Sequence, residues 1–220
     1  MDTLLILDFL SELKENNNRE WFQVNRKRFD AATAEFKKYV ATLIAEVLRF
    51  DSSIGGLTPG DCLFRIYRDV RFSADKSPYK INFGAFLAPG GRKSLKAGYY
   101  FHLEPGNSLL GGGIYMPMPD VQKKLRQEVY FHVEEFKGIL NHLDFLRYFG
   151  AMDTFDKMKK PPRDFPADFP DIDLLKYRSY TILHTLPEAM LFSDALVDYT
   201  IAVFKAMKPL NDFLSRAVEG

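Results

Sequence analysis

The sequence contains a single cysteine and almost no net charge, and each of these shortages excludes a class of protein. Cys62 stands alone among 220 residues, so the chain cannot form an intramolecular disulfide or a cysteine-based zinc cluster, as is usual in a reducing compartment. The 30 Lys and Arg residues against 29 Asp and Glu residues give a formal net charge of +1. No global field therefore draws the chain to nucleic acid or to an anionic membrane, and any anion site must be local.

Long apolar runs and the common catalytic signatures are missing as well. The apolar stretch at residues 4–10 is interrupted by Asp8 and is too short to cross a membrane. No basic segment precedes it, so we expect neither export nor membrane insertion, and a cytoplasmic location. There is no P-loop, no Rossmann glycine fingerprint and no Gly-x-Ser-x-Gly elbow. His132, His142 and His184 lack metal-ligand spacing, so we expect no metal site, and no cofactor can be named.

Hydrophobic periodicity places helices at both ends of the chain and strands in the middle. Helical spacing covers residues 1–50 and returns within residues 119–220, apart from a proline-rich loop predicted at residues 157–170. Pro209 is expected to break or kink the last helix. Period-two alternation within residues 61–116 predicts four sequential strands, at about 62–67, 79–87, 95–104 and 109–116. The pattern predicts an α+β fold, an antiparallel β-meander with N-terminal and C-terminal helices packed on one face. The length is compatible with a single domain of residues 1–220.

The same alternation predicts which side chains share the sheet face opposite the core. That face gathers cationic, aromatic and acid/base groups: Arg65, Tyr67, Lys80, Asn82, Tyr100, His102 and Glu104. His102 and Glu104 are two residues apart on one strand, as an acid/base pair requires. Glycines at positions 84, 98 and 111–113 clear space among them. Such a face is either a ligand site or the solvated side of an antiparallel sheet.

The densest charge lies in residues 64–84, which read FRIYRDVRFSADKSPYKINFG. Five cations face two carboxylates there, interleaved with aromatic rings: Arg65, Arg68, Arg71, Lys76 and Lys80, with Asp69 and Asp75, and with Phe64, Tyr67, Phe72 and Tyr79. Guanidinium groups bind phosphate or carboxylate with two bonds at a time, which favours an oxyanion-binding turn. The competing interpretation is an internal ion-pair network in which Arg68 pairs with Asp69 or Asp75.

These patterns leave three functional hypotheses open. In the first, a pocket on the polar sheet face binds a small phosphate- or carboxylate-bearing ligand, with or without catalysis. Its ligand-binding residues are Arg65, Tyr67, Arg68, Arg71, Lys76, Tyr79, Lys80 and Tyr100, and its catalytic pair is His102 and Glu104. In the second, the basic turn docks an acidic partner protein or a polyanion; nucleic acid is disfavoured because the chain lacks a basic stripe. In the third, the charges are purely structural. The oligomeric state is not predicted.

Two motifs carry a resemblance to a known family. One is F-L-x-x-L-x-x-N-N-x-R-x-W-F at residues 9–22, and the other is R-x-x-R-D-x-R-F-S-x-D-K-x-P-Y-K at residues 65–80. With these motifs the sequence resembles a widespread, mainly bacterial family of conserved proteins of unknown function, and the resemblance covers nearly the whole chain. A later proline-rich segment departs from the family pattern at Arg163 and Phe169. The resemblance implies no activity and no established site residues.

Overall fold

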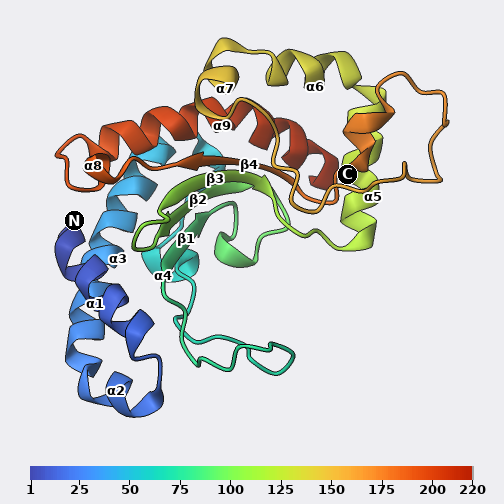
Figure 1. The fold of residues 1–220 in the computed structure, drawn as a ribbon. Coiled ribbons are helices and arrows are strands. Elements are labelled where there is room, and N and C mark those ends of the chain that lie inside the picture. Colours follow the sequence, from blue (N-terminus) through green and yellow to red (C-terminus); the bar gives the residue numbers. More distant parts are fainter. Residues whose placement is uncertain (220) are drawn as a thin grey trace. The chain divides into compact units, whose positions relative to one another are not determined.

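The structure is a computed structural model that describes residues 1–219 (Figure 1). These residues divide into two compact units. The first unit contains Met1–Arg92, Tyr100–Leu110 and Thr185–Ile201, and the second contains Lys93–Tyr99, Gly111–His184 and the chain from Ala202 onward. The predicted single domain stays a prediction.

The fold class predicted from the sequence is confirmed, because helices at both ends of the chain flank an antiparallel sheet of order β1-β2-β3-β4. The helices are α1 (Thr3–Glu15), α2 (Arg19–Val24), α3 (Arg26–Leu48), α4 (Pro59–Cys62), α5 (Pro119–Phe131), α6 (Val133–Leu140), α7 (Leu143–Tyr148), α8 (Glu188–Leu191) and α9 (Leu196–Glu219). The strands are β1 (Phe83–Leu87), β2 (Gly98–Leu103), β3 (Leu109–Ile114) and β4 (Tyr180–Thr185), and 3-10 turns occupy Ser52–Ile54, Gly91–Lys93 and Ile172–Lys176. No helix among residues 1–219 is long and apolar enough to cross a membrane.

The strand predicted at residues 62–67 is wrong. Cys62 ends helix α4, and the following segment makes only two isolated bridges, Leu63 with Ala85 and Tyr67 with Tyr79. Between these two bridges, one segment advances by four residues, from 63 to 67, whereas the segment opposite advances by six, from 79 to 85. The two extra residues in the second segment interrupt the β-ladder. The sheet takes its fourth strand from β4 instead, a segment for which the sequence analysis assigned no strand.

The first helices begin where asparagine and aspartate side chains can cap them. The carboxylate of Asp2 accepts a hydrogen bond from the backbone N–H of Leu5 at 3.0 Å, and the Asn18 side chain accepts one from Trp21 at 2.9 Å. Thr3 is the first residue inside the helix, and its hydroxyl donates to the Leu191 carbonyl at 2.7 Å. The break between α2 and α3 falls at Asn25.

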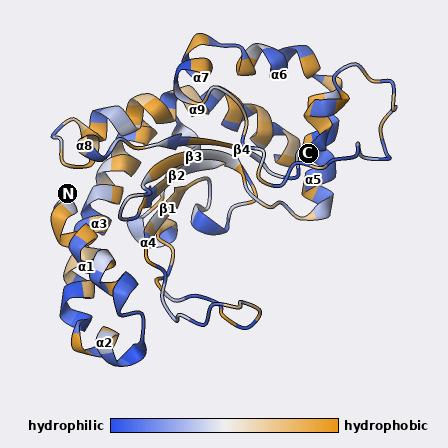
Figure 2. Ribbon diagram, in the orientation of Figure 1, coloured by the Kyte–Doolittle hydropathy of each residue, from blue (hydrophilic) through white to orange (hydrophobic). Residues whose placement is uncertain are grey.

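In the first unit, the core lies between α3 and one face of β1 and β2. Phe36 packs against Phe83 at 5.4 Å between ring centroids, and Tyr39 packs against Phe101 at 5.0 Å. Hydrophobic and hydrophilic segments alternate along α3, as expected for a helix with one buried stripe (Figure 2). Since Phe101 points to this core, the alternating residues Tyr100 and His102 point to the opposite face of β2.

In the second unit, α9 packs on β2 and β3. Phe204 contacts Tyr99 at 5.1 Å between ring centroids, and the Asn211 side chain accepts from Gly113 N–H at 2.8 Å and donates to the Gly98 carbonyl at 3.1 Å. The helix does not end at Pro209 but continues to Glu219. Of the two expected effects of Pro209, a break or a kink, the break is therefore absent within the described part of α9.

The single cysteine offers a simple test of the packing in the first unit. Cys62 is fully buried, and burial together with the nearby Asp61 carboxylate raises the pKa of its thiol to about 11. Because the thiolate is the reactive form, we expect the folded protein to react very slowly with a thiol reagent such as DTNB at pH 8, and quickly in guanidinium chloride. Fast labelling without denaturant would contradict the buried position.

Candidate functional site

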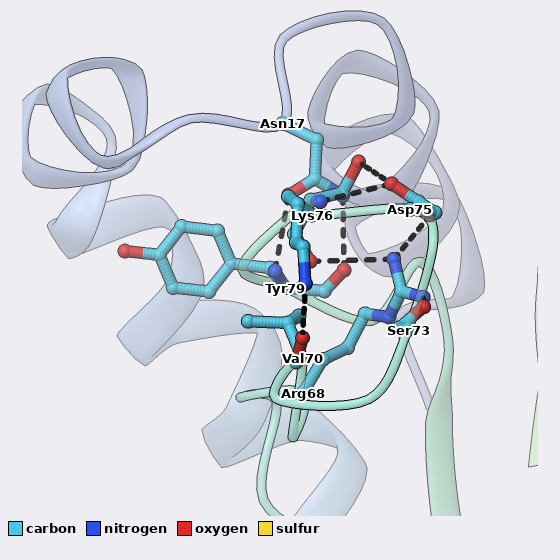
Figure 3. Close-up of polar contacts among 8 residues, drawn as sticks. Asn17, Arg68, Val70, Ser73, Asp75, Lys76 and Tyr79 are labelled. Carbon is cyan, nitrogen blue, oxygen red and sulfur yellow. Dashed lines mark hydrogen bonds and ion pairs between the residues drawn. The ribbon is translucent and has the colours of Figure 1, made fainter.

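We call residues 63–82, between helix α4 and strand β1, the charged hairpin. Within it, the side chain of Arg68 is held by an ion pair and by hydrogen bonds (Figure 3). The Arg68 guanidinium pairs with Asp75 and also donates to the Ser77 carbonyl at 3.2 Å and to the Ser73 hydroxyl at 3.3 Å. Asp75 in turn accepts from the hydroxyl of Ser77 at 2.7 Å and from its backbone N–H at 2.9 Å. These bonds from Ser77, with that of Arg68, hold the pKa of the Asp75 carboxyl well below its usual range.

Two more of the predicted anion-binding cations are also used within the hairpin. The Arg71 guanidinium donates two hydrogen bonds to the Asp69 carboxylate, at 3.0 and 2.7 Å. Lys76 donates one to the Val70 carbonyl at 3.0 Å. The side-chain bonds from Arg71 lower the pKa of the Asp69 carboxyl to about 2. The charges of the hairpin therefore mainly satisfy one another rather than converge on a free space.

This pairing predicts how the hairpin carboxyls titrate. A depressed folded-state pKa stabilises the fold above the ordinary aspartate pKa, and the contribution disappears as the pH falls through the folded value. The ordering of the hairpin by Asp69 is thus expected to be complete above about pH 4 and lost toward about pH 2. Carbon-detected NMR should show Asp69 titrating near pH 2, and Arg71→Gln should raise that pKa while leaving Asp75 unchanged. An ordinary pKa for Asp69 in the wild type would contradict the ion pair.

The base of the hairpin is fastened to the corner between α1 and α2. The Asn17 side chain donates to the Tyr79 carbonyl at 2.9 Å and accepts from the Tyr79 N–H at 3.1 Å, in the manner of a paired strand (Figure 3). The ring of Tyr79 stacks on Phe22 with centroids 4.0 Å apart, and Tyr79 is only 3% exposed. The two motifs at residues 9–22 and 65–80 therefore meet at this contact.

A second cluster lies on the polar face of β2, where three side chains form a hydrogen-bonded row. The Tyr100 hydroxyl lies 2.8 Å from Nδ1 of His102, and Nε2 of His102 lies 2.8 Å from the carboxylate of Glu104. The side chains of His102 and Glu104 are only 15% and 19% exposed. Because an ionised carboxylate can only accept, we assign the imidazole proton to Nε2, which leaves Nδ1 to accept from Tyr100. We call these residues the Tyr–His–Glu row.

Polar neighbours and a glycine hold the row in place. The Asn82 amide lies 3.4 Å from Nδ1 of His102, and the Asn107 amide donates to Glu104 at 3.3 Å. A Cβ at Gly84 would lie 2.7 Å from the Tyr100 hydroxyl oxygen and 3.1 Å from a ring carbon. The space cleared at Gly84, which the sequence pattern predicted, is thus filled by the Tyr100 ring.

Two cations of the charged hairpin, Arg65 and Lys80, form no ion pair with a carboxylate in the described chain, although the charge of Arg65 acts on Asp69. Lys80 is half-buried, and its Nζ lies 5.4 Å from the centre of the Phe64 ring. The Phe64 ring in turn contacts the Tyr100 ring edge to face, with ring centroids 6.1 Å apart. Burial, and secondarily the charge of Arg65, lower the pKa of the Lys80 ammonium group. Arg65 itself is exposed. Neither side chain makes a hydrogen bond or an ion pair with a carboxylate within residues 1–219.

Comparison with known protein families shows to which family the chain belongs. Residues 5–213 match the family described as conserved hypothetical protein (DUF2461). The chain belongs to this family. No curated protein and no solved structure matches it.

Within this DUF2461 chain, the predicted site residues fall into two groups. The first group belongs to the charged hairpin and its base: Arg65, Tyr67, Arg68, Arg71, Lys76, Tyr79 and Lys80. The second group, Tyr100, His102 and Glu104, lies on the polar sheet face, and Lys80 reaches toward it through its contact with Phe64. Three neighbours of these residues were not predicted as site residues from the sequence: Phe64, Asn82 and Asn107. The available signal for Asn82 was that it lies two residues after Lys80 and therefore shares a strand face with it. The contacts of Phe64 and Asn107 depend on loop geometry.

Proposed function

We propose that the polar sheet face of this DUF2461 protein binds a small ligand that carries a phosphate or carboxylate group, and that the Tyr–His–Glu row moves a proton on that ligand. The observation that carries the proposal is the row itself, with both of its links at 2.8 Å. A nucleophile or acid bonded to an imidazole, which a carboxylate orients in turn, is the arrangement that acid/base catalysis uses.

The unpaired cations supply the reason to expect an anion. A partly buried ammonium group without a carboxylate partner loses hydration that the face of one aromatic ring replaces only in part, and a ligand anion offsets the rest. Lys80 is in this position, whereas Arg68 and Arg71 already hold Asp75 and Asp69. We therefore narrow the anion-binding set to Arg65 and Lys80.

The row supplies the chemistry. With its proton on Nε2, His102 can take the hydroxyl proton of Tyr100 at Nδ1, and Glu104 then stabilises the imidazolium that forms. The Tyr100 oxygen or the imidazole can act as a general base toward a bound ligand, and can return the proton as a general acid.

The competing function, docking of an acidic partner by the charged hairpin, is favoured by one observation. Phe72 is 96% exposed near the turn of the hairpin, with the Arg71 guanidinium 5.9 Å from the centre of its ring. An exposed aromatic ring beside cations suits a protein surface better than a small ligand. In this alternative Phe72→Ala abolishes binding and the Tyr–His–Glu row is irrelevant.

A thermal-shift screen with a matched pair of variants tests the proposal. We expect one class of compound among phosphates, sugar phosphates, nucleotides and carboxylates to raise the melting temperature, since occupancy at a hundredfold over Kd stabilises by about 2.7 kcal/mol. Arg65→Ala should abolish the shift, while Arg71→Ala, whose guanidinium is held by Asp69, should keep it. A flat response across the panel, or an equal response in Arg65→Ala, would refute the proposal.

A further inference from the structure

The surroundings of Lys80 differ from those of the other cations in the charged hairpin. Its side chain is half-buried, and within residues 1–219 its Nζ has neither a carboxylate nor a hydrogen-bond acceptor, only the face of Phe64 at 5.4 Å. Lys76, by contrast, is exposed and donates to a backbone carbonyl. An amine that is not held as an ammonium ion by an anion loses its proton more readily.

Burial is the main cause that lowers the pKa of Lys80, and the charge of Arg65 adds to it. A lysine in an apolar contact beside a second cation is one of the known ways in which an amine becomes a nucleophile toward carbonyl compounds. One aromatic ring, that of Phe64, separates this amine from Tyr100 and so from the proton-carrying row. The amine thus has the environment for nucleophilic attack.

We infer that Lys80 forms an imine with an aldehyde or ketone that also carries the anionic group. The inference rests on the proposed function but gives its two cations different roles: Arg65 would hold the anion, while Lys80, in its neutral form, would meet the carbonyl carbon instead of pairing with the anion. The narrowed ligand class is therefore an anionic carbonyl compound, such as a 2-oxo acid or a phosphorylated aldehyde.

The reaction is balanced without any oxidant or reductant. The lone pair of neutral Nζ attacks the carbonyl carbon, so a C–N bond forms and the C=O π bond breaks. The two N–H protons then leave with the carbonyl oxygen as water, which gives the neutral imine. Because the Phe64 ring separates Nζ from the Tyr–His–Glu row, solvent water carries these protons from nitrogen to oxygen, and the C–O bond breaks as water leaves.

Reductive trapping with a matched pair of probes tests the inference. Pyridoxal 5′-phosphate, an aldehyde with a phosphate group, and pyridoxal, the same aldehyde without it, are each added to the full chain and reduced with borohydride. Peptide mass spectrometry then locates the label. We expect the phosphorylated probe to label Lys80 in preference to the other lysines, and pyridoxal to show no such preference. Arg65→Ala should remove the preference, and excess inorganic phosphate should suppress it.

Two variants complete the test. Lys80→Arg keeps the charge and should lose the preferential label, while Lys76→Arg should keep it. Label spread evenly over the lysines would overturn the inference, as would an equal preference for both probes. If phosphates stabilise the protein through Arg65 but Lys80 stays unlabelled, the imine is refuted and anion binding stands. If neither effect is seen, both proposals fall.

Discussion

Replacing Gly113 by alanine is expected to lower the free energy of unfolding by more than about 4 kcal/mol, or to prevent the second unit from folding. Gly113 lies in β3 with φ +97°, and a Cβ there would stand 1.9 Å from the backbone carbonyl oxygen of Tyr180 in β4. Backbone atoms of a paired strand cannot move aside as a side chain can. The methyl group would therefore separate the two strands.

Gly106→Ala is the matched control for that experiment. Gly106 also has a positive φ, +73°, but nothing lies within 4 Å of the position of its Cβ. It should incur only the conformational cost of the left-handed backbone, about 1–2 kcal/mol. Urea unfolding followed by far-UV circular dichroism measures both variants. A loss at Gly113 no larger than the loss at Gly106 would show that β3 and β4 are not packed as closely as described.

The β2 strand shows how far sequence alone could reach. Tyr100 and His102 were expected on the face opposite the core, and the observed burial follows that alternation, since Tyr99 and Phe101 between them are buried. The prediction succeeded because period two is a local property of an extended chain whose one face is covered by a core. It also placed His102 and Glu104 together before any contact was known.

The charged hairpin shows where that reasoning ends. The residues before and after the turn alternate like strands, yet the bridge of Leu63 to Ala85 and that of Tyr67 to Tyr79 are out of step by two residues. This irregular geometry determines which carboxylate pairs with Arg68. It also determines that Lys80 has no carboxylate partner in the described chain. Strand β4 was missed for a related reason, because its pairing with β3 joins segments about 70 residues apart in sequence. Spacing within a segment carries no information on either point.

The second large effect is expected at Asn211, whose side chain links α9 to two strands of the second unit. It accepts from Gly113 N–H and donates to the Gly98 carbonyl, and Asn211 is only 4% exposed. Asn211→Leu keeps the volume but leaves both backbone groups buried without partners, at about 1–3 kcal/mol each. The apolar side chain recovers part of this through burial, so we expect a net loss of about 2–4 kcal/mol in the free energy of unfolding.

Two companion variants separate the lost hydrogen bonds from other causes. Asn141→Leu, at an exposed asparagine after α6, should change the free energy of unfolding by less than about 0.5 kcal/mol. Asn211→Asp keeps the acceptor for Gly113 but, once ionised, turns a negative oxygen toward the Gly98 carbonyl. Its stability should therefore rise as the pH is lowered and the carboxyl becomes a donor, which Asn211→Leu cannot reproduce. Equal stability of Asn211→Leu and the wild type would mean that these two bonds do not hold α9 to the sheet, and the packing of Phe204 on Tyr99 would then have to do so.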